Sequence, residues 1–237
     1  MEGKSLVAGS ILLGAAMVAS AWMLAPAFEK AADKMLENSR VVVVKGLAER
    51  TVDADRVVMP FTFSECAPTL EEAVSRSDKA KNEILKFLNT HGVKREDIHS
   101  RTPSLSDTYK ETYNTNRNPE CRFNIRDGIN IDSRDVATVK GLYKDLDQLV
   151  KSGVPLDDST WSTNFIFTGL NNIKPSMVEE STRNARQVAE KFAHDSGSAL
   201  GRIKTATQGQ FSITDEEGDN SRKVVRVVST VTYFLND

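Results

Sequence analysis

Histidine and cysteine are scarce in this chain, which has 3 histidines and 2 cysteines in 237 residues. A zinc site takes about four ligands at close spacings, whereas His91, His99 and His194 are scattered along the sequence. His91 and His194 are predicted in the last turns of helices, where a cation is favoured by the carbonyl ends. We therefore expect no metal site and no cofactor.

Catalytic motifs are missing as well. The sequence has no G-x-x-x-x-G-K-[ST] loop, no G-x-S-x-G turn, no H-E-x-x-H helix and no G-x-G-x-x-G after a predicted strand. The stretch DSGSALG at 195–201 follows a predicted helix, so it indicates a helix end and not a phosphate cradle. The expectation is a noncatalytic protein without catalytic or cofactor-binding residues.

Adjacent carboxylates give no acid–base pair. Neighbouring positions on a helix do not face each other. The pairs concerned are Glu71-Glu72, Glu179-Glu180 and Glu216-Glu217.

Neither sign of charge predominates. The chain has 31 basic and 33 acidic residues and a net charge of -2, which disfavours binding to nucleic-acid phosphates. Its 39% hydrophobic and 27% charged residues are typical of a globular protein that buries a core.

The N-terminus carries a long apolar run. No charge occurs from Ser5 to Phe28, and about 20 apolar residues cross a bilayer, whereas a signal-peptide core has about 7 to 15. This length predicts a retained transmembrane anchor at residues 6–28. The small residues of Ala25-Pro26-Ala27 keep cleavage and secretion open as the alternative.

The charges on either side of the anchor bear on its orientation. Lys4 precedes the anchor and Lys30, Lys34 and Arg40 follow it. The positive-inside rule thus weakly opposes export of the rest of the chain.

Beyond a polar link at residues 29–39, residues 40–237 are expected to form one α+β domain. Alternation and caps predict strands near 41–44, 56–66, 98–109, 121–131, 161–168, 202–213 and 223–235, and helices near 70–91, 135–151 and 175–195. The first two strands are expected to pair through a turn at 52–55, and Thr69 and Glu72 have capping-box form. Such an order predicts a largely antiparallel sheet with three packed helices.

Two apolar patterns bear on assembly. The helix at 175–195 is expected to bury a stripe, and the last strand carries apolar residues on both faces, which both need cover. The stripe is Met177, Ala185, Val188, Ala189 and Phe192; one strand face is Val225, Val227, Val231, Tyr233 and Leu235, and the other is Val224, Val228 and Phe234. We expect self-association through whatever strand or helix faces stay uncovered.

Cys66 and Cys121 are expected to stay unpaired. Cys121 shares strand parity with Phe123 and Ile125, whereas Cys66 lies on the Pro60 face of its own strand, and a disulfide needs converging side chains. Tyr109 and Tyr113, in a polar loop, are the best candidates for exposed binding aromatics.

Four stretches in order resemble the SIMPL-domain family of bacterial envelope proteins. They are VVVVKGLAERTVDADRV, HGVKREDIHSRTPSLSDTY, ARQVAEKFAHDSGSALGRIKTATQGQFSI and KVVRVVSTVTYFLND. The resemblance implies an anchored or secreted periplasmic domain, often oligomeric and associated with envelope or oxidative-stress defence. It implies export and supplies no catalytic residue.

These observations favour a noncatalytic, inner-membrane-tethered protein that faces the periplasm and binds itself or another envelope protein. One alternative is an enzyme with an unrecognised pocket, with Cys66 as a reactive thiol, which would require a lowered thiol pKa. Another is a small-ligand or lipid-binding module, which would require a sizeable apolar cavity.

Overall fold

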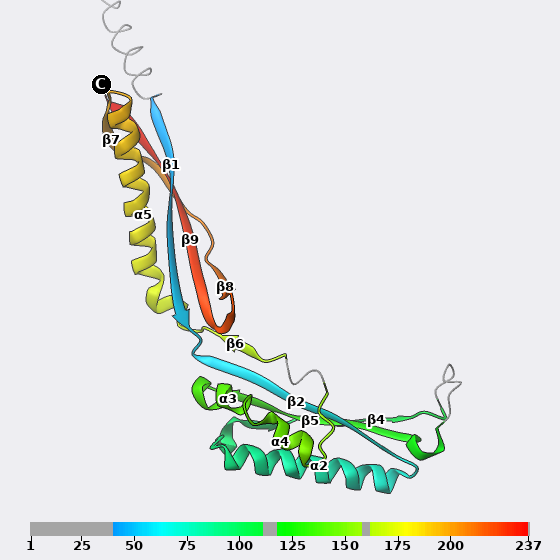
Figure 1. The fold of residues 1–237 in the computed structure, drawn as a ribbon. Coiled ribbons are helices and arrows are strands. Elements are labelled where there is room, and N and C mark those ends of the chain that lie inside the picture. The colour runs from blue at the N-terminus through cyan, green and yellow to red at the C-terminus, as the bar shows by residue number, and fades with distance from the viewer. Residues whose placement is uncertain (1–39, 111–117, 158–161, 237) are drawn as a thin grey trace, which may run out of the picture. The chain divides into compact units, whose positions relative to one another are not determined.

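A computed structural model of the chain describes residues 40–110, 118–157 and 162–236 (Figure 1). Within these ranges the structure is α+β, as predicted, with helices packed on antiparallel sheets. The expected anchor at residues 6–28 lies outside the described residues. In the described part, no helix has the length and apolar character that crossing a bilayer requires.

The strands form two sheets where the sequence predicts one. The first sheet has the order β1-β9-β7, with β8 also paired to β9: β1 is Val41–Asp53, β7 Ala199–Gln208, β8 Ser212–Glu216 and β9 Asp219–Asn236. The second has the order β3-β5-β2-β6, with β4 also paired to β5: β2 is Arg56–Ala67, β3 Ile98–Ser100, β4 Ser104–Asp107, β5 Phe123–Ser133 and β6 Asn164–Ile166.

The chain also divides into two compact units. Unit 1 comprises Met1–Glu49, Pro175–Phe211 and Arg226–Asp237, and unit 2 comprises Arg50–Lys174 and Ser212–Val225. Strands β1 and β9 contribute residues to both units.

The predicted hairpin between the first two strands is wrong. The Ala54 amide donates to the Ser221 carbonyl at 2.9 Å, and the Asp55 amide donates to the Ile166 carbonyl at 2.9 Å. The chain therefore leaves one sheet and enters the other without a turn. Residues 52–55 contain no glycine or asparagine, which the tight hairpin turns prefer.

In unit 2, β2 and β5 run antiparallel from the pair Val57 and Ser133 to the pair Ala67 and Phe123. Alternate residues of β2 point into a core that α2 (Leu70–Thr90), α3 (Val136–Leu142) and α4 (Leu146–Lys151) cover on one face (Figure 1). The buried β2 side chains are Val57, Met59, Phe61 and Phe63. The predicted alternation of this strand is confirmed.

Helix α2 begins and ends where the sequence predicts. The Thr69 hydroxyl accepts from the Glu72 amide at 3.3 Å, and Gly92 follows the helix with a φ of 79°. The reciprocal half of the capping box does not form, because the Glu72 carboxylate accepts from Arg76 at 2.6 Å instead.

The predicted helix at 135–151 is divided into α3 and α4. The amides of Lys144 and Asp145 bond three residues back, to Gly141 and Leu142, so the chain tightens between the two helices. Asp135 caps α3, because its carboxylate accepts from the Thr138 amide at 3.0 Å. Val139, Leu142, Leu146 and Leu149 are buried, and Val136 packs partly buried against the same core, whereas Val150 is 60% exposed.

In unit 1, α5 (Leu170–Asp195) contributes residues 175–195 and packs on the sheet through small residues at every fourth position. These are Ser181, Ala185, Ala189 and Ala193. A Cβ at Gly46 of β1 would overlap the backbone of Ser181 and Ala185, and the Asn184 amide donates to the Leu47 carbonyl at 2.8 Å. The helix therefore lies unusually close to β1.

Two details of α5 differ from the prediction. The helix begins at Leu170, so Pro175 lies inside it. Val188 and Phe192 are 41% and 59% exposed, although both were expected in the core. Four residues turn an α-helix by 40° more than a full turn, so the buried stripe drifts around the helix. Near its C-terminal end the stripe has moved away from Val188 and Phe192.

Candidate functional site

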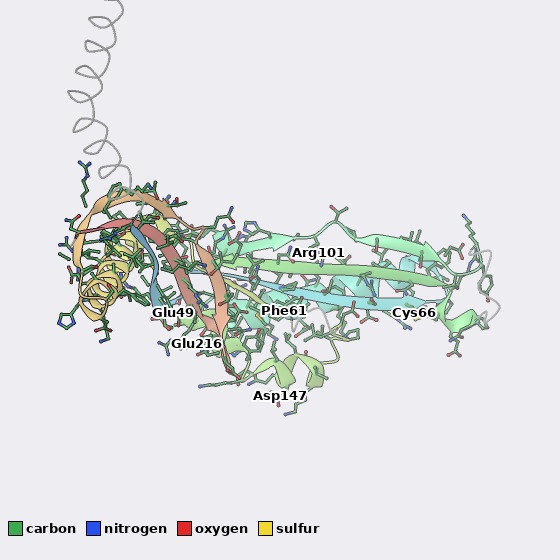
Figure 2. The ribbon with its side chains drawn as sticks, turned by 90° about the horizontal axis from the view of Figure 1, so that it is seen from above. Glu49, Phe61, Cys66, Arg101, Asp147 and Glu216 are labelled. Atoms are coloured by element: carbon green, nitrogen blue, oxygen red, sulfur yellow. A yellow bond between two sulfur atoms is a disulfide. The ribbon has the colours of Figure 1, made fainter. Side chains whose placement is uncertain are left out.

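Cys66 and Cys121 form a disulfide, so the prediction of two unpaired thiols is wrong. The strand-parity argument fails because Cys121 is not in β5. It ends the short 3-10 helix η2 (Pro119–Cys121), which precedes that strand. Cys66 lies near the end of β2 (Figure 2), and the two Cα atoms are 5.0 Å apart, within the usual range for a bridge.

Charged and aromatic side chains surround the bridge. Arg76 donates to the Cys66 carbonyl at 2.8 Å. Arg122 donates to both carboxylate oxygens of Asp107 at 3.2 and 3.1 Å, and this hydrogen bonding lowers the pKa of Asp107. The Arg122 guanidinium also lies 5.2 Å from the Tyr109 ring centre. Tyr109 thus belongs to a structural cluster; Tyr113, the other aromatic singled out, lies outside the described residues.

The histidines have separate places. His91 follows the last turn of α2, with its Nδ1 2.8 Å from the Phe87 carbonyl. His194 lies in the last turn of α5, as predicted, and His99 lies in β3. Among the described residues, no three His, Cys, Asp or Glu side chains gather closely enough to hold a metal ion.

One carboxylate of each adjacent pair forms an ion pair with an arginine: Glu72 with Arg76, Glu179 with Arg183, and Glu216 with Arg222. At 195–201 the chain ends α5 and turns, with Gly197 at a φ of 70°, as predicted.

A polar hollow of about 520 Å³ lies in unit 2 at the Arg56 end of β2. Arg56 donates to both carboxylate oxygens of Asp132, at 2.7 and 2.5 Å, and this lowers the pKa of Asp132. Asp97 accepts from the Ser133 hydroxyl at 2.6 Å. Arg56 thus holds the Asp132 carboxylate as an ionised acceptor, which is the opposite of what a general acid needs.

A lysine and a serine meet at the start of β9. Lys140 donates to the Ser221 hydroxyl at 2.6 Å and to the Asp219 carboxylate at 3.0 Å, while the Ser221 hydroxyl donates to Asp219 at 2.6 Å. Hydrogen bonds from Ser221 and Lys140 lower the pKa of Asp219 to about 2. Lys140, Ser221 and Asp219 thus form one hydrogen-bonded cluster within unit 2.

An apolar hollow lies on the surface of α5. Its volume is about 430 Å³, and its lining comprises Gln187, Val188, Lys191, Phe192 and Asp195. The two apolar side chains are four positions apart and therefore lie one above the other on the helix. We call Val188 and Phe192 the α5 patch.

In the described part of the chain, the face of the unit 1 sheet away from α5 is also exposed. Val44 and Ala48 of β1 are buried, whereas Val43 and Leu47 are 61% and 41% exposed. The open face of unit 1 comprises Val43, Lys45, Leu47 and Glu49 of β1, Arg226, Val228, Thr230, Thr232 and Phe234 of β9, and Arg202 and Lys204 of β7.

The family model named SIMPL, described as a protein of unknown function (DUF541), matches residues 42–230. The chain belongs to the SIMPL family. The match covers most of the described residues and includes nearly all of the four stretches whose resemblance the sequence showed. No curated protein matches this chain.

Sequence reasoning missed two features of this SIMPL chain. The sequence signal near the disulfide is Asn118-Pro119, because Asn-Pro favours the start of a turn and a turn can contain Cys121. The α5 patch could have been found from the four-residue spacing of Ser181, Ala185, Ala189 and Ala193, which marks the buried side better than apolar character does.

Proposed function

We propose that this SIMPL chain is a noncatalytic envelope protein that binds other copies of itself, or a second envelope protein, through the α5 patch. The proposal includes a tether to the inner membrane through residues 6–28 and exposure of residues 40–237 to the periplasm. A role in envelope or oxidative-stress defence remains the expectation from the family resemblance.

The exposed pair Val188 and Phe192 carries the proposal. Large apolar side chains that line a hollow on a helix surface favour binding of another protein. The charged residues beside the patch form ion pairs with each other: Arg186 pairs with Glu190 at 2.8 Å, and Lys191 with Asp195 at 3.4 Å. A polar rim around an apolar centre is the usual anatomy of a protein interface.

The disulfide supports the periplasmic location. Disulfides persist in oxidising compartments and are rare in the bacterial cytoplasm. The bond between Cys66 and Cys121 therefore favours export. It outweighs the charge count around the anchor, which weakly opposes export.

Light scattering of the full chain in detergent, corrected for bound detergent, tests the binding role. The wild type is expected to have the mass of a multimer, and Phe192→Glu the mass of a monomer, because a carboxylate cannot be buried unpaired at an interface. Val150→Glu is the matched control, since Val150 is also a helical residue and is 60% exposed, in unit 2.

An unchanged mass for Phe192→Glu would exclude the α5 patch as the contact. A monomeric wild type, with no envelope protein captured by a photo-cross-linking residue at position 192, would contradict the whole binding role.

Protease added to spheroplasts tests the location separately. It is expected to digest residues 40–237 while a short membrane fragment persists. A protected domain would contradict periplasmic exposure, and a mature N-terminus at Phe28 would establish cleavage in place of a tether.

A further inference from the structure

The open face of unit 1 combines exposed basic side chains with exposed apolar ones. We propose that this face binds the anionic lipid surface of the membrane in which the chain is tethered. The inference rests on the tether proposed above, and it concerns a different surface from the α5 patch.

Charge is the first observation. Lys45, Arg202, Lys204 and Arg226 are exposed on this face, and among the described residues that form it Glu49 is the one carboxylate. Within the described part of the chain, none of these four basic side chains has an ion pair. The basic residues Arg183, Arg186 and Lys191 of α5, by contrast, each pair with a carboxylate four positions away. The open face thus carries excess positive charge in a chain of net charge -2.

Apolar area is the second observation. Val43 and Leu47 project from β1 between charged neighbours. The Phe234 ring lies under two cations, 5.8 Å from the Arg202 guanidinium carbon and 5.4 Å from the Lys204 ammonium. Surfaces that mix basic groups with aromatic and aliphatic side chains favour the boundary between headgroups and acyl chains.

The length of chain before β1 puts this face within reach of the bilayer. The Leu235 amide donates to the Arg40 carbonyl at 3.0 Å, so the first described residue is fixed at the edge of the unit 1 sheet. Only residues 29–39 separate it from the end of the uncharged stretch at Phe28. Eleven extended residues span at most about 40 Å. The part of β1 in unit 1, residues 41–49, is roughly 30 Å long. The linker is therefore long enough for the open face to lie against the bilayer.

A second copy of the chain fits this face less well. A two-fold contact places the same patch of each copy against the other. Lys45, Arg202, Lys204 and Arg226 would then meet their own counterparts, and like charges across an interface are unfavourable. An anionic lipid surface complements all four.

The test uses the full chain in vesicles, with one labelling site added on the open face. Thr230→Cys places a thiol in the middle of β9, and the native cysteines are already bonded to each other, so a spin label attaches at one position. The label is expected to lose access to a water-soluble relaxant in vesicles containing phosphatidylglycerol, and to keep it in phosphatidylcholine alone. High salt should restore access, because it screens the attraction.

Charge variants of the labelled chain provide the control. The double variant Lys45→Gln with Lys204→Gln is expected to lower the ratio of membrane-bound to free open face roughly 25-fold. Each basic residue near an anionic surface raises that binding ratio about five-fold. Lys79→Gln with Lys86→Gln changes the net charge equally, on the exposed surface of α2, and should leave the ratio unchanged.

Equal access in both kinds of vesicle would overturn the proposal. Protection of the label that increases with the protein-to-lipid ratio and is the same in charged and neutral vesicles would also overturn it. A second copy of the chain would then cover the face. Loss of the protein from carbonate-washed vesicles of either composition would instead show that the tether has failed.

Discussion

Gly46 lies where β1 passes beneath α5, and its missing side chain lets two backbones come into contact. A Cβ there would overlap the Ser181 carbonyl and the Ala185 amide. Both belong to backbone segments that side-chain rotation cannot move aside. Small residues on α5 and a glycine on β1 therefore act together to set the distance between the helix and the sheet.

Gly46→Ala is expected to destabilise unit 1 by about 1 to 3 kcal/mol, the usual cost of overpacking. Urea unfolding of the full chain, with hydrogen exchange of the α5 amides, measures the effect. Gly141→Ala is the control: nothing lies within 4 Å of its added Cβ, and alanine is favoured over glycine in a helix by about 1 kcal/mol. Equal stability of the two variants would contradict the close packing of α5.

Asp219 makes stability depend on acid pH. Its folded pKa of about 2 lies below the unfolded value of about 3.9. The ionised form is thus stabilised by folding, and this stabilisation is present above pH 4 and lost as the pH falls towards 2.

Acid unfolding of the wild type and of Asp219→Asn, followed by circular dichroism at constant ionic strength, tests this dependence. The variant should be less stable near neutral pH, and the difference should shrink between about pH 4 and pH 2. A difference that stays constant over that range would show that Asp219 gains nothing from Lys140 and Ser221.

At the scale of elements, repeating patterns predicted what a single element buries but not which elements pair. Alternation in β2 identified Met59, Phe61 and Phe63, and the Thr69 cap identified the start of α2. The pairing of β1 with β9 depends on hydrogen bonds between opposite ends of the sequence. Local propensity carries no information about such contacts. The prediction that the first two strands pair as a hairpin is wrong for this reason.

The uncovered surfaces show the same limit. The open face of unit 1 follows from strand alternation once the single covering helix is known. The α5 patch does not, because apolar character alone places Phe192 in the core. The structure exposes it since the helix packs through alanines that let it approach β1 closely.

The disulfide joins the end of β2 to η2 across a sequence separation of 55 residues. Its removal in Cys66→Ser with Cys121→Ser is expected to destabilise unit 2 by about 2 to 4 kcal/mol, because the unfolded chain regains the entropy of an open loop. Urea unfolding of the full chain, with and without reductant, measures this loss of stability.

Reductant should lower the stability of the wild type and leave the double variant unchanged. Thiol counting on denatured protein prepared without reductant should find no free thiol in the wild type. Two free thiols would restore the original expectation of unpaired cysteines.

At the scale of the whole molecule, each unit has its own buried cluster. The cluster of unit 2 contains Phe61, Phe63 and Ile84, and that of unit 1 contains Val44, Ala185 and Val231. Both proposed surfaces belong to unit 1, one on α5 and one on the sheet. Binding of a partner and of lipid can therefore be separated by point substitutions within one unit.

The pairing of β1 with β9 has a consequence for how the chain is made. A chain synthesised from its N-terminus completes the strands of the second sheet, which end at Ile166, long before β9 exists. Domains fold as units during synthesis when their residues are available. The four valines at the start of β1 therefore stay without their β9 partner until β9 has been synthesised. During that time the unpaired strand needs protection from aggregation.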